Sequence, residues 1–96
     1  MIVKVLRYQV RREAAAAALE ATRVFVDEVV RKEGGTAKYE AFQQKDDPAR
    51  FTHVMTFRTP SAEEYHRKTS WNKAFAEKLA PLLTAPAATE ELVKVE

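Results

Sequence analysis

The chain has 96 residues, of which 46% are hydrophobic and 31% are charged, a balance typical of folded globular proteins and not of disordered or fibrous ones. Its length suits a small core, and we expect one domain over residues 1–96. Sixteen basic and 14 acidic residues leave a net charge of +2 with the two signs interspersed, so no nucleic-acid partner is expected.

The first two predicted elements are a strand and a long helix. Residues 2–10 are rich in β-branched and aromatic residues and are short enough for a strand. Residues 12–32 carry apolar residues at helical spacing, and Gly34 and Gly35 are expected to end this helix in a left-handed conformation. The stripe expected to be buried consists of Ala15, Ala18, Leu19, Thr22, Phe25, Val26, Val29 and Val30.

A hairpin and a helical pair follow. Residues 36–44 and 50–58 are predicted strands around a turn at 45–49, which contains Asp-Asp-Pro. Ser61 and Glu64 form a capping box that predicts a helix over 61–69, and Ser70 is the predicted cap of a second helical segment over 71–83. Thr69 and Ser70 are therefore expected to join two helices.

The tail at residues 91–96 is predicted to be the last strand, which gives the order β-α-β-β-α-β. This order predicts an α+β, ferredoxin-like fold with an antiparallel sheet and helices on one face. The strands nevertheless carry apolar residues on both faces: Val3 and Val5 oppose Ile2, Leu6 and Tyr8, and Phe51, Met55 and Phe57 oppose Val54. A large apolar face is rarely left in water, so we expect a homodimer packed sheet against sheet.

Several classes of function lack their sequence signals. The third strand has Thr52 where an RNA-recognition domain places an aromatic residue, and the turn after the first strand lacks the glycine of a phosphate cradle. The absence of cysteine excludes thiolate metal sites, and the two histidines have no spaced carboxylate, so no metal is expected. The stretch MIVKVLRYQVRRE has no long apolar region of the kind found in signal peptides, and no apolar stretch reaches membrane-spanning length, so we expect a cytoplasmic protein that does not bind membranes.

What remains is an apolar, aromatic cleft. Phe51, His53, Met55 and Phe57 alternate onto one face of a strand, and Tyr65, His66, Trp71 and Phe75 lie on the helices that would cover it. An apolar cleft with one or two titratable groups is suited to bind a flat aromatic or quinone-like molecule.

These residues carry a family resemblance. The chain resembles the antibiotic-biosynthesis-monooxygenase (ABM) domain, a quinol-monooxygenase-like family, over GGTAKYEAFQQKDDPARFTHVMTFRTPSAEEYHRKTSWNKAFAEKLAPLLTAP. The features that carry it are the glycine before the second strand, the core of Tyr39, Glu40 and Phe42, the Asp-Asp-Pro turn, and the helix with His66.

The resemblance implies a dimeric α+β barrel with a ligand cavity between sheet and helices. It further implies oxygenation of a small aromatic phenol or quinol by O2 with no metal, flavin or haem cofactor. His66 matches the helix histidine of the family. Trp71 stands where a second histidine often follows, Met55 replaces a common glutamate, and Phe57 replaces a common tryptophan. No histidine occurs in the segment where haem-degrading relatives carry one, so haem degradation is not expected.

His66 is the predicted catalytic base, since an imidazole accepts protons near neutral pH. The predicted substrate-binding residues are Tyr39, His53, Met55, Phe57, Tyr65, Trp71 and Phe75. Plainer interpretations stay open: His66 on the helix surface or at its cap, His53 in a structural or interface role, and Trp71 and Phe75 as core. Two other functions also stay open, an isomerase or proton shuttle that uses the same base, and a non-catalytic small-molecule-binding or stress-response barrel.

Overall fold

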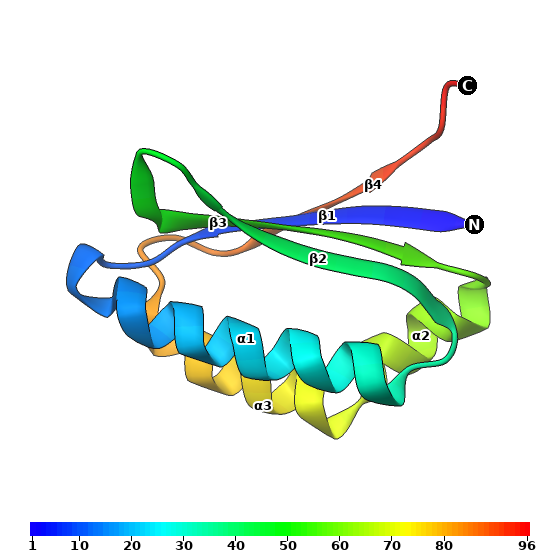
Figure 1. Cartoon of the computed structure of the whole chain (residues 1–96), viewed down its shortest axis with the longest axis horizontal. Coiled ribbons are helices and arrows are strands. Elements are labelled where there is room, and N and C mark those ends of the chain that lie inside the picture. Colours follow the sequence, from blue (N-terminus) through cyan, green and yellow to red (C-terminus); the bar gives the residue numbers. More distant parts are fainter.

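A computed structural model describes all 96 residues as one antiparallel sheet with helices on a single face (Figure 1). The strands are β1 (Ile2–Gln9), β2 (Thr36–Gln44), β3 (Asp47–Phe57) and β4 (Ala88–Leu92); the helices are α1 (Ala15–Lys32), α2 (Pro60–Lys68) and α3 (Ser70–Leu79), with 3-10 turns η1 (Arg12–Ala14) and η2 (Ala80–Leu82). The sheet order is β2-β3-β1-β4, with each neighbouring pair antiparallel. The predicted α+β, ferredoxin-like class is confirmed.

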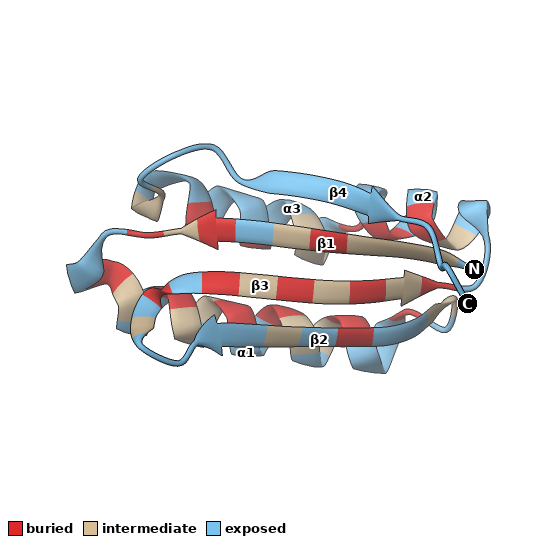
Figure 2. Cartoon of the chain, turned by 90° about the horizontal axis from the view of Figure 1, so that it is seen from above, coloured by how far each residue is buried: buried red, intermediate tan, exposed pale blue.

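The helix-facing side of the sheet is set by the alternation along β3. Phe51, His53, Met55 and Phe57 are buried, and the residues between them are only partly so, which Figure 2 shows as alternating bands. In the register of β1 with β3, Leu6 lies opposite His53, so it shares this inner face. The central strands thus present one continuous wall to the helices.

Helix α1 packs its small and aromatic residues against this wall. Ala18, Thr22, Phe25 and Val29 are buried, as the helical spacing predicts. Val30 was expected in the same stripe, but 66% of it is exposed. One residue past Val29 on a helix is a turn of about 100°, which carries Val30 out of the interface with the sheet.

The end of α1 departs from the prediction at the two glycines. Neither Gly34 nor Gly35 has a positive φ, and the helix ends instead at Glu33 in an extended conformation. Gly35 is needed for another reason: a Cβ there would lie 2.5 Å from the Cβ of Ala62. The missing side chain lets the start of β2 pass close to α2.

The caps of the two short helices differ by one or two residues from the prediction. Thr59, not Ser61, caps α2, accepting a hydrogen bond from the Ala62 amide, with Pro60 in the first turn. Thr69, not Ser70, caps α3 through the Asn72 amide. The joint itself is confirmed, because Thr69 both ends α2 and begins α3.

The hairpin and the last strand also have other bounds than predicted. Strand β3 begins at Asp47, three residues earlier than expected, because Gln44 pairs with Asp47 across a shorter turn. The last strand is β4 rather than residues 91–96, since Leu92 already pairs with Val3 and β1 offers almost no partner beyond it. Figure 2 shows β4 exposed along its length.

The outer face of the sheet carries no helix. In the register, Val3, Val5 and Val54 share this face with Phe42 and Leu92, of which the last two are exposed. None of the helices combines the length and the apolar character that crossing a bilayer requires.

Candidate functional site

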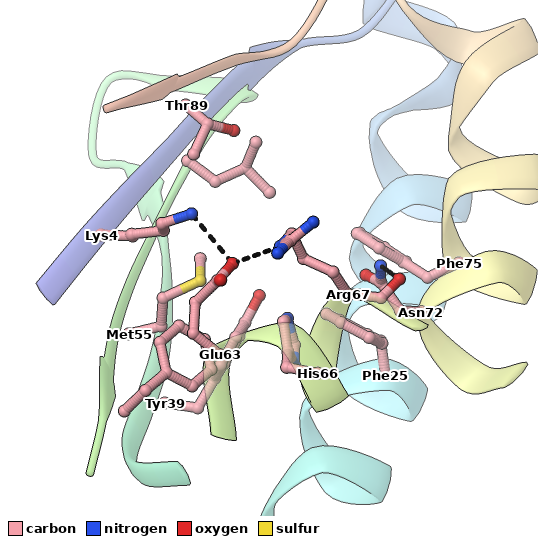
Figure 3. A pocket seen from close by; sticks show the side chains of 12 residues that line it. Lys4, Phe25, Tyr39, Met55, Glu63, His66, Arg67, Asn72, Phe75 and Thr89 are labelled. Carbon is pink, nitrogen blue, oxygen red and sulfur yellow. Dashed lines mark hydrogen bonds and ion pairs between the residues drawn. The ribbon is translucent and has the colours of Figure 1, made fainter. Parts of the chain in front are cut away.

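A cavity of about 200 Å³ lies between the inner face of the sheet and the helices (Figure 3). Its walls come from β1, β2, β3 and β4 on one side and from the three helices on the other. The lining residues are Lys4, Leu6, Phe25, Tyr39, Met55, Phe57, Glu63, His66, Arg67, Asn72, Phe75 and Thr89. Half of them are hydrophobic, and three of the six polar ones lie on α2, with one each on β1, β4 and α3.

His66 is the one histidine in this lining, and it is held by a buried carboxylate. Its Nδ1 lies 2.8 Å from Oε1 and 3.0 Å from Oε2 of Glu33. The side chains of His66 and Glu33 are 7% and 1% exposed. A carboxylate accepts only, so Nδ1 carries the hydrogen in this contact, and Nε2 of a neutral ring carries the lone pair.

Glu33 is itself fixed by two further donors. The Trp71 indole Nε1 lies 2.6 Å from Oε2, and the Thr36 hydroxyl lies 2.7 Å from Oε1. These donors come from α3 and β2. The carboxylate of Glu33, at the end of α1, therefore links both elements to His66 of α2. The orientation of His66 is therefore set by a group that cannot itself turn.

The other ring nitrogen of His66 is open to the cavity. No protein group bonds to Nε2, and yet the protein contains no enclosed side-chain nitrogen or oxygen without a partner. Nε2 is therefore accessible, and the cavity is the space that His66 lines. The rings of Phe57, Tyr39 and Phe25 lie around the His66 ring, at centroid distances of 5.1, 5.7 and 5.9 Å.

An ion-pair cluster occupies the polar side of the cavity. The carboxylate of Glu63 accepts from Lys4 Nζ at 2.9 Å and from Arg67 Nε at 2.6 Å, as the dashed lines of Figure 3 mark. Burial alone would raise the pKa of Glu63, but the hydrogen bonds and charges of Arg67 and Lys4 hold it below its usual range. Two cations and one anion thus lie at the polar side.

His53 lies behind the cavity wall and is completely buried, at 0% exposed. Its Nε2 lies 2.7 Å from the Tyr8 hydroxyl and its Nδ1 lies 2.8 Å from the Tyr39 hydroxyl. Burial, with the charge of His66 as a second cause, lowers the pKa of His53 to about 4. His53 is therefore neutral at pH 7, and both its nitrogens are occupied.

The structure brings five of the eight predicted site residues together and leaves three apart. His66, Tyr39, Met55, Phe57 and Phe75 line the cavity. His53 is separated from the cavity because Tyr39 bonds to it from the cavity side, and Trp71 because its indole turns to Glu33. Tyr65, 55% exposed on the outside of α2, packs only edge-on against Trp71.

Sequence reasoning missed Glu33 and the polar cluster. Lys4 and Leu6 could have been found from strand alternation, which puts them on the face of Tyr8. Glu63 could have been found from helical spacing, since it lies three residues before His66, and Arg67 could have been found because it lies four residues after Glu63. Glu33 gave no such signal, because its partner His66 lies 33 residues away in the sequence.

No group of three or more His, Asp and Glu side chains is arranged to hold a metal ion. A larger space of about 450 Å³ lies between α1 and β2, where Leu19, Val26, Val30 and Ala41 form the apolar part of the lining. It holds no histidine, and its two charged residues are Arg23 and Asp27. We therefore regard the cavity at His66 as the functional site.

The family model described as antibiotic biosynthesis monooxygenase matches residues 1–78 of the sequence. The chain belongs to this family. The matched residues include both histidines, Glu33 and all but one residue of the cavity lining. None of the curated proteins matches the sequence significantly.

Solved structures share the fold of this ABM protein over almost the entire chain. A Nitrosomonas europaea protein that carries the family name aligns with a TM-score of 0.93 and 23% identity, covering 100% of both chains. Rv0793 from Mycobacterium tuberculosis gives 0.89 and 20% identity, covering 99% of this chain and 95% of its own. PA3566 from Pseudomonas aeruginosa gives 0.88 and 21% identity, covering 99% and 94%. Identities of this size establish the fold and leave the substrate to the site itself.

Proposed function

We propose that the protein oxidises a small aromatic phenol or quinol with O2 and without a bound cofactor, and that His66 is the general base. The observation that carries this proposal is the open Nε2 of His66, oriented by Glu33 in a largely apolar cavity. A base whose other nitrogen is anchored to a carboxylate has one tautomer and one direction of action. Membership of the ABM family supports the reaction class.

The chemistry needs little from the protein besides deprotonation. A closed-shell molecule reacts with triplet O2 only slowly, whereas its anion can give O2 one electron and then combine with the superoxide formed. Nε2 of His66 takes the proton, and the peroxide that results loses water to leave a carbonyl. In the keto tautomer of the phenol or quinol, the ring carbon next to or opposite the oxygen is a CH2 group. This CH2 becomes C=O while the other oxygen atom of O2 leaves as water, and the substrate supplies all four electrons.

The cavity supports a substrate of one or two fused rings. An apolar cavity of about 150 Å³ accommodates benzene, and this one measures about 200 Å³. Phe25, Phe57 and Phe75 provide flat walls. Lys4 and Arg67 lie where they can donate hydrogen bonds to substrate oxygens, which favours an oxygenated ring over a hydrocarbon.

Oxygen consumption tests the proposal. Freshly reduced naphthoquinols and catechols are supplied to the wild type and to His66→Ala, each against an autoxidation blank. We expect uptake above the blank that falls about 100-fold or more in His66→Ala. Tyr65→Ala is the matched control, because Tyr65 is the preceding residue of α2 and lies outside the cavity, and it should keep wild-type uptake.

Oxygen uptake also distinguishes the proposed reaction from the two other functions. An isomerase or proton shuttle would turn over a carbonyl substrate through His66 without consuming O2. A binding protein would hold the quinol and show no turnover in either form. Uptake that is unchanged in His66→Ala would refute His66 as the base.

We also propose that two copies pack through the helix-free face of the sheet. Val3, Val5 and Val54 lie on that face, and Phe42 and Leu92 are exposed there. Burying such a face against a second copy removes apolar surface from water. Sedimentation at micromolar concentration should give a dimer, which Phe42→Glu should dissociate; a monomeric wild type would refute this arrangement.

A further inference from the structure

Four side chains form a continuous hydrogen-bonded chain through the core. The Thr22 hydroxyl lies 2.9 Å from the Tyr8 hydroxyl, which lies 2.7 Å from Nε2 of His53. Nδ1 of His53 in turn lies 2.8 Å from the Tyr39 hydroxyl. All four residues are buried, at 6% exposed or less.

The two ends of this chain differ. The Tyr8 hydroxyl has two protein partners, whereas the Tyr39 hydroxyl has His53 alone. Tyr39 also lines the cavity, with its ring 5.7 Å from that of His66. The hydrogen-bonded chain therefore has one closed end in the core and one end at a residue that lines the site.

A neutral histidine between two phenols allows two arrangements of protons. If Nδ1 carries the hydrogen, His53 donates to Tyr39, the Tyr8 hydroxyl donates to Nε2, and the Tyr39 proton is free for the cavity. If Nε2 carries it, His53 donates to Tyr8, and the Tyr39 proton is used on Nδ1. Only the first arrangement makes Tyr39 a donor toward a ligand.

We propose that His53 is a positioning residue that turns Tyr39 into a hydrogen-bond donor for an oxygen atom of the ligand. This inference rests on the proposed function, because it assigns the ligand an accepting carbonyl or phenolate oxygen beside His66. His53 itself touches no ligand and acts through the proton that it leaves on Tyr39. A ligand that accepts from Tyr39 therefore selects the Nδ1–H tautomer of His53.

The groups around the chain support this role. Burial raises the pKa of Tyr39 far above its ordinary value, with Tyr8 and Glu33 adding to the shift, so Tyr39 keeps its proton to donate. Burial likewise raises the pKa of Tyr8 to about 12, against the opposing effect of Thr22. Every group in the chain is thus uncharged at neutral pH, and proton placement alone distinguishes the two arrangements.

Nitrogen NMR of the histidine rings tests the proposal on the full-length protein. The protein contains two histidines, and His66→Gln leaves the signals of His53 alone for assignment. The probe is 1,4-naphthoquinone, which accepts hydrogen bonds and donates none. At saturation, we expect the two ring nitrogens of His53 to show Nδ1 protonated and Nε2 unprotonated. The Nε2–H tautomer in the complex, or no binding of the quinone, would overturn the proposal.

Two variants measure the effect on affinity. Tyr39→Phe removes the donor, and we expect the dissociation constant of 1,4-naphthoquinone to rise about tenfold. Tyr8→Phe removes the partner of Nε2, together with that of the Thr22 hydroxyl, and we expect a rise of a few fold although Tyr8 lies outside the cavity. Equal affinity in wild type and both variants would contradict the proposal.

These readouts are independent of turnover. If oxygen uptake fails while the quinone still selects the Nδ1–H tautomer, the proposed reaction is wrong and the role of His53 stands. If uptake depends on His66 but the tautomer of His53 is the other one, the reaction stands and the role of His53 is wrong.

Discussion

The two histidines of this protein have similar burial and opposite surroundings. His53 is 0% exposed and His66 is 5% exposed. His53 has a partner on each ring nitrogen, and both partners are neutral phenols. His66 has a carboxylate on one nitrogen and the cavity at the other. The number of occupied nitrogens, rather than burial, separates the histidine available for proton transfer from the one that is not.

The neighbours of each histidine explain the difference. A base in an active site needs an anchored nitrogen and a free one, which Glu33 and the cavity provide for His66. A histidine inside a core needs two partners, since an unpaired buried nitrogen costs about 1–3 kcal/mol. Tyr8 and Tyr39 supply these partners to His53.

Glu33→Gln should have the largest effect, because it replaces the carboxylate that anchors His66. The amide can donate to Nδ1 and so move the hydrogen of the ring to Nε2, where it blocks the base. We expect turnover of an accepted quinol to fall by about 100- to 1,000-fold with little change in quinol binding. Steady-state oxygen uptake measures both; a variant with wild-type turnover would show that the anchor has no role.

Acid should act on His53 through stability. Its folded pKa of about 4 lies below the unfolded value, about 6.5, so folding favours the neutral ring. This contribution is complete above pH 6.5 and is lost as pH falls toward 4, which amounts to about 3 kcal/mol of unfolding free energy. Urea unfolding between pH 7 and 4 should show this slope in the wild type and a shallower one in His53→Gln. Parallel slopes would contradict the assignment.

Trp71→Phe tests whether the hydrogen bond from the indole holds Glu33 in place. The indole donates at 2.6 Å to Oε2 of Glu33, the oxygen that lies 3.0 Å from Nδ1 of His66, and phenylalanine keeps the aromatic packing. We expect a loss of about 1–2 kcal/mol of unfolding free energy and a turnover reduced by less than tenfold. Thermal denaturation and oxygen uptake measure the two effects. Tyr65→Phe, on the exposed side of the same aromatic pair, should change neither.

Glu63→Gln should have the smallest effect, because it changes the charge of the cavity lining and leaves the contact between His66 and Glu33 intact. The substitution leaves Lys4 and Arg67 without their shared anion. We expect anionic ligands such as 2-naphthoate to bind a few fold more tightly and neutral 1,4-naphthoquinone to bind as before. Calorimetric titration with both compounds distinguishes these results; an equal change for the two would show that charge is not the cause.

The sequence predicted the order of elements well because periodicity depends on neighbours in the chain. The buried faces of α1 and β3 follow from spacing alone, apart from Val30. The caps were placed one or two residues away because the stretch from Thr59 to Ser70 offers several hydroxyls that can cap a helix. Spacing cannot choose among such equivalents.

The candidate site was harder to predict because it depends on contacts between distant segments. His66 and Glu33 are 33 residues apart, and Tyr8 and His53 are 45 apart. Strand alternation put His53 on the same face as Phe51 without deciding whether that face meets the helices, and its closure by two tyrosines needs the register of β1, β2 and β3. Trp71 was predicted to wall the cavity, and only the structure reveals that its indole serves Glu33.

Acylation with diethyl pyrocarbonate tests the difference between the two histidines most directly, because this reagent modifies unprotonated, accessible imidazole nitrogens. The folded protein is labelled near neutral pH and then digested, and each histidine peptide is analysed by mass spectrometry. We predict modification of His66, with loss of oxygen uptake in parallel, and none of His53 in the folded chain. Modification of His53 before His66, or full uptake with His66 acylated, would contradict the account.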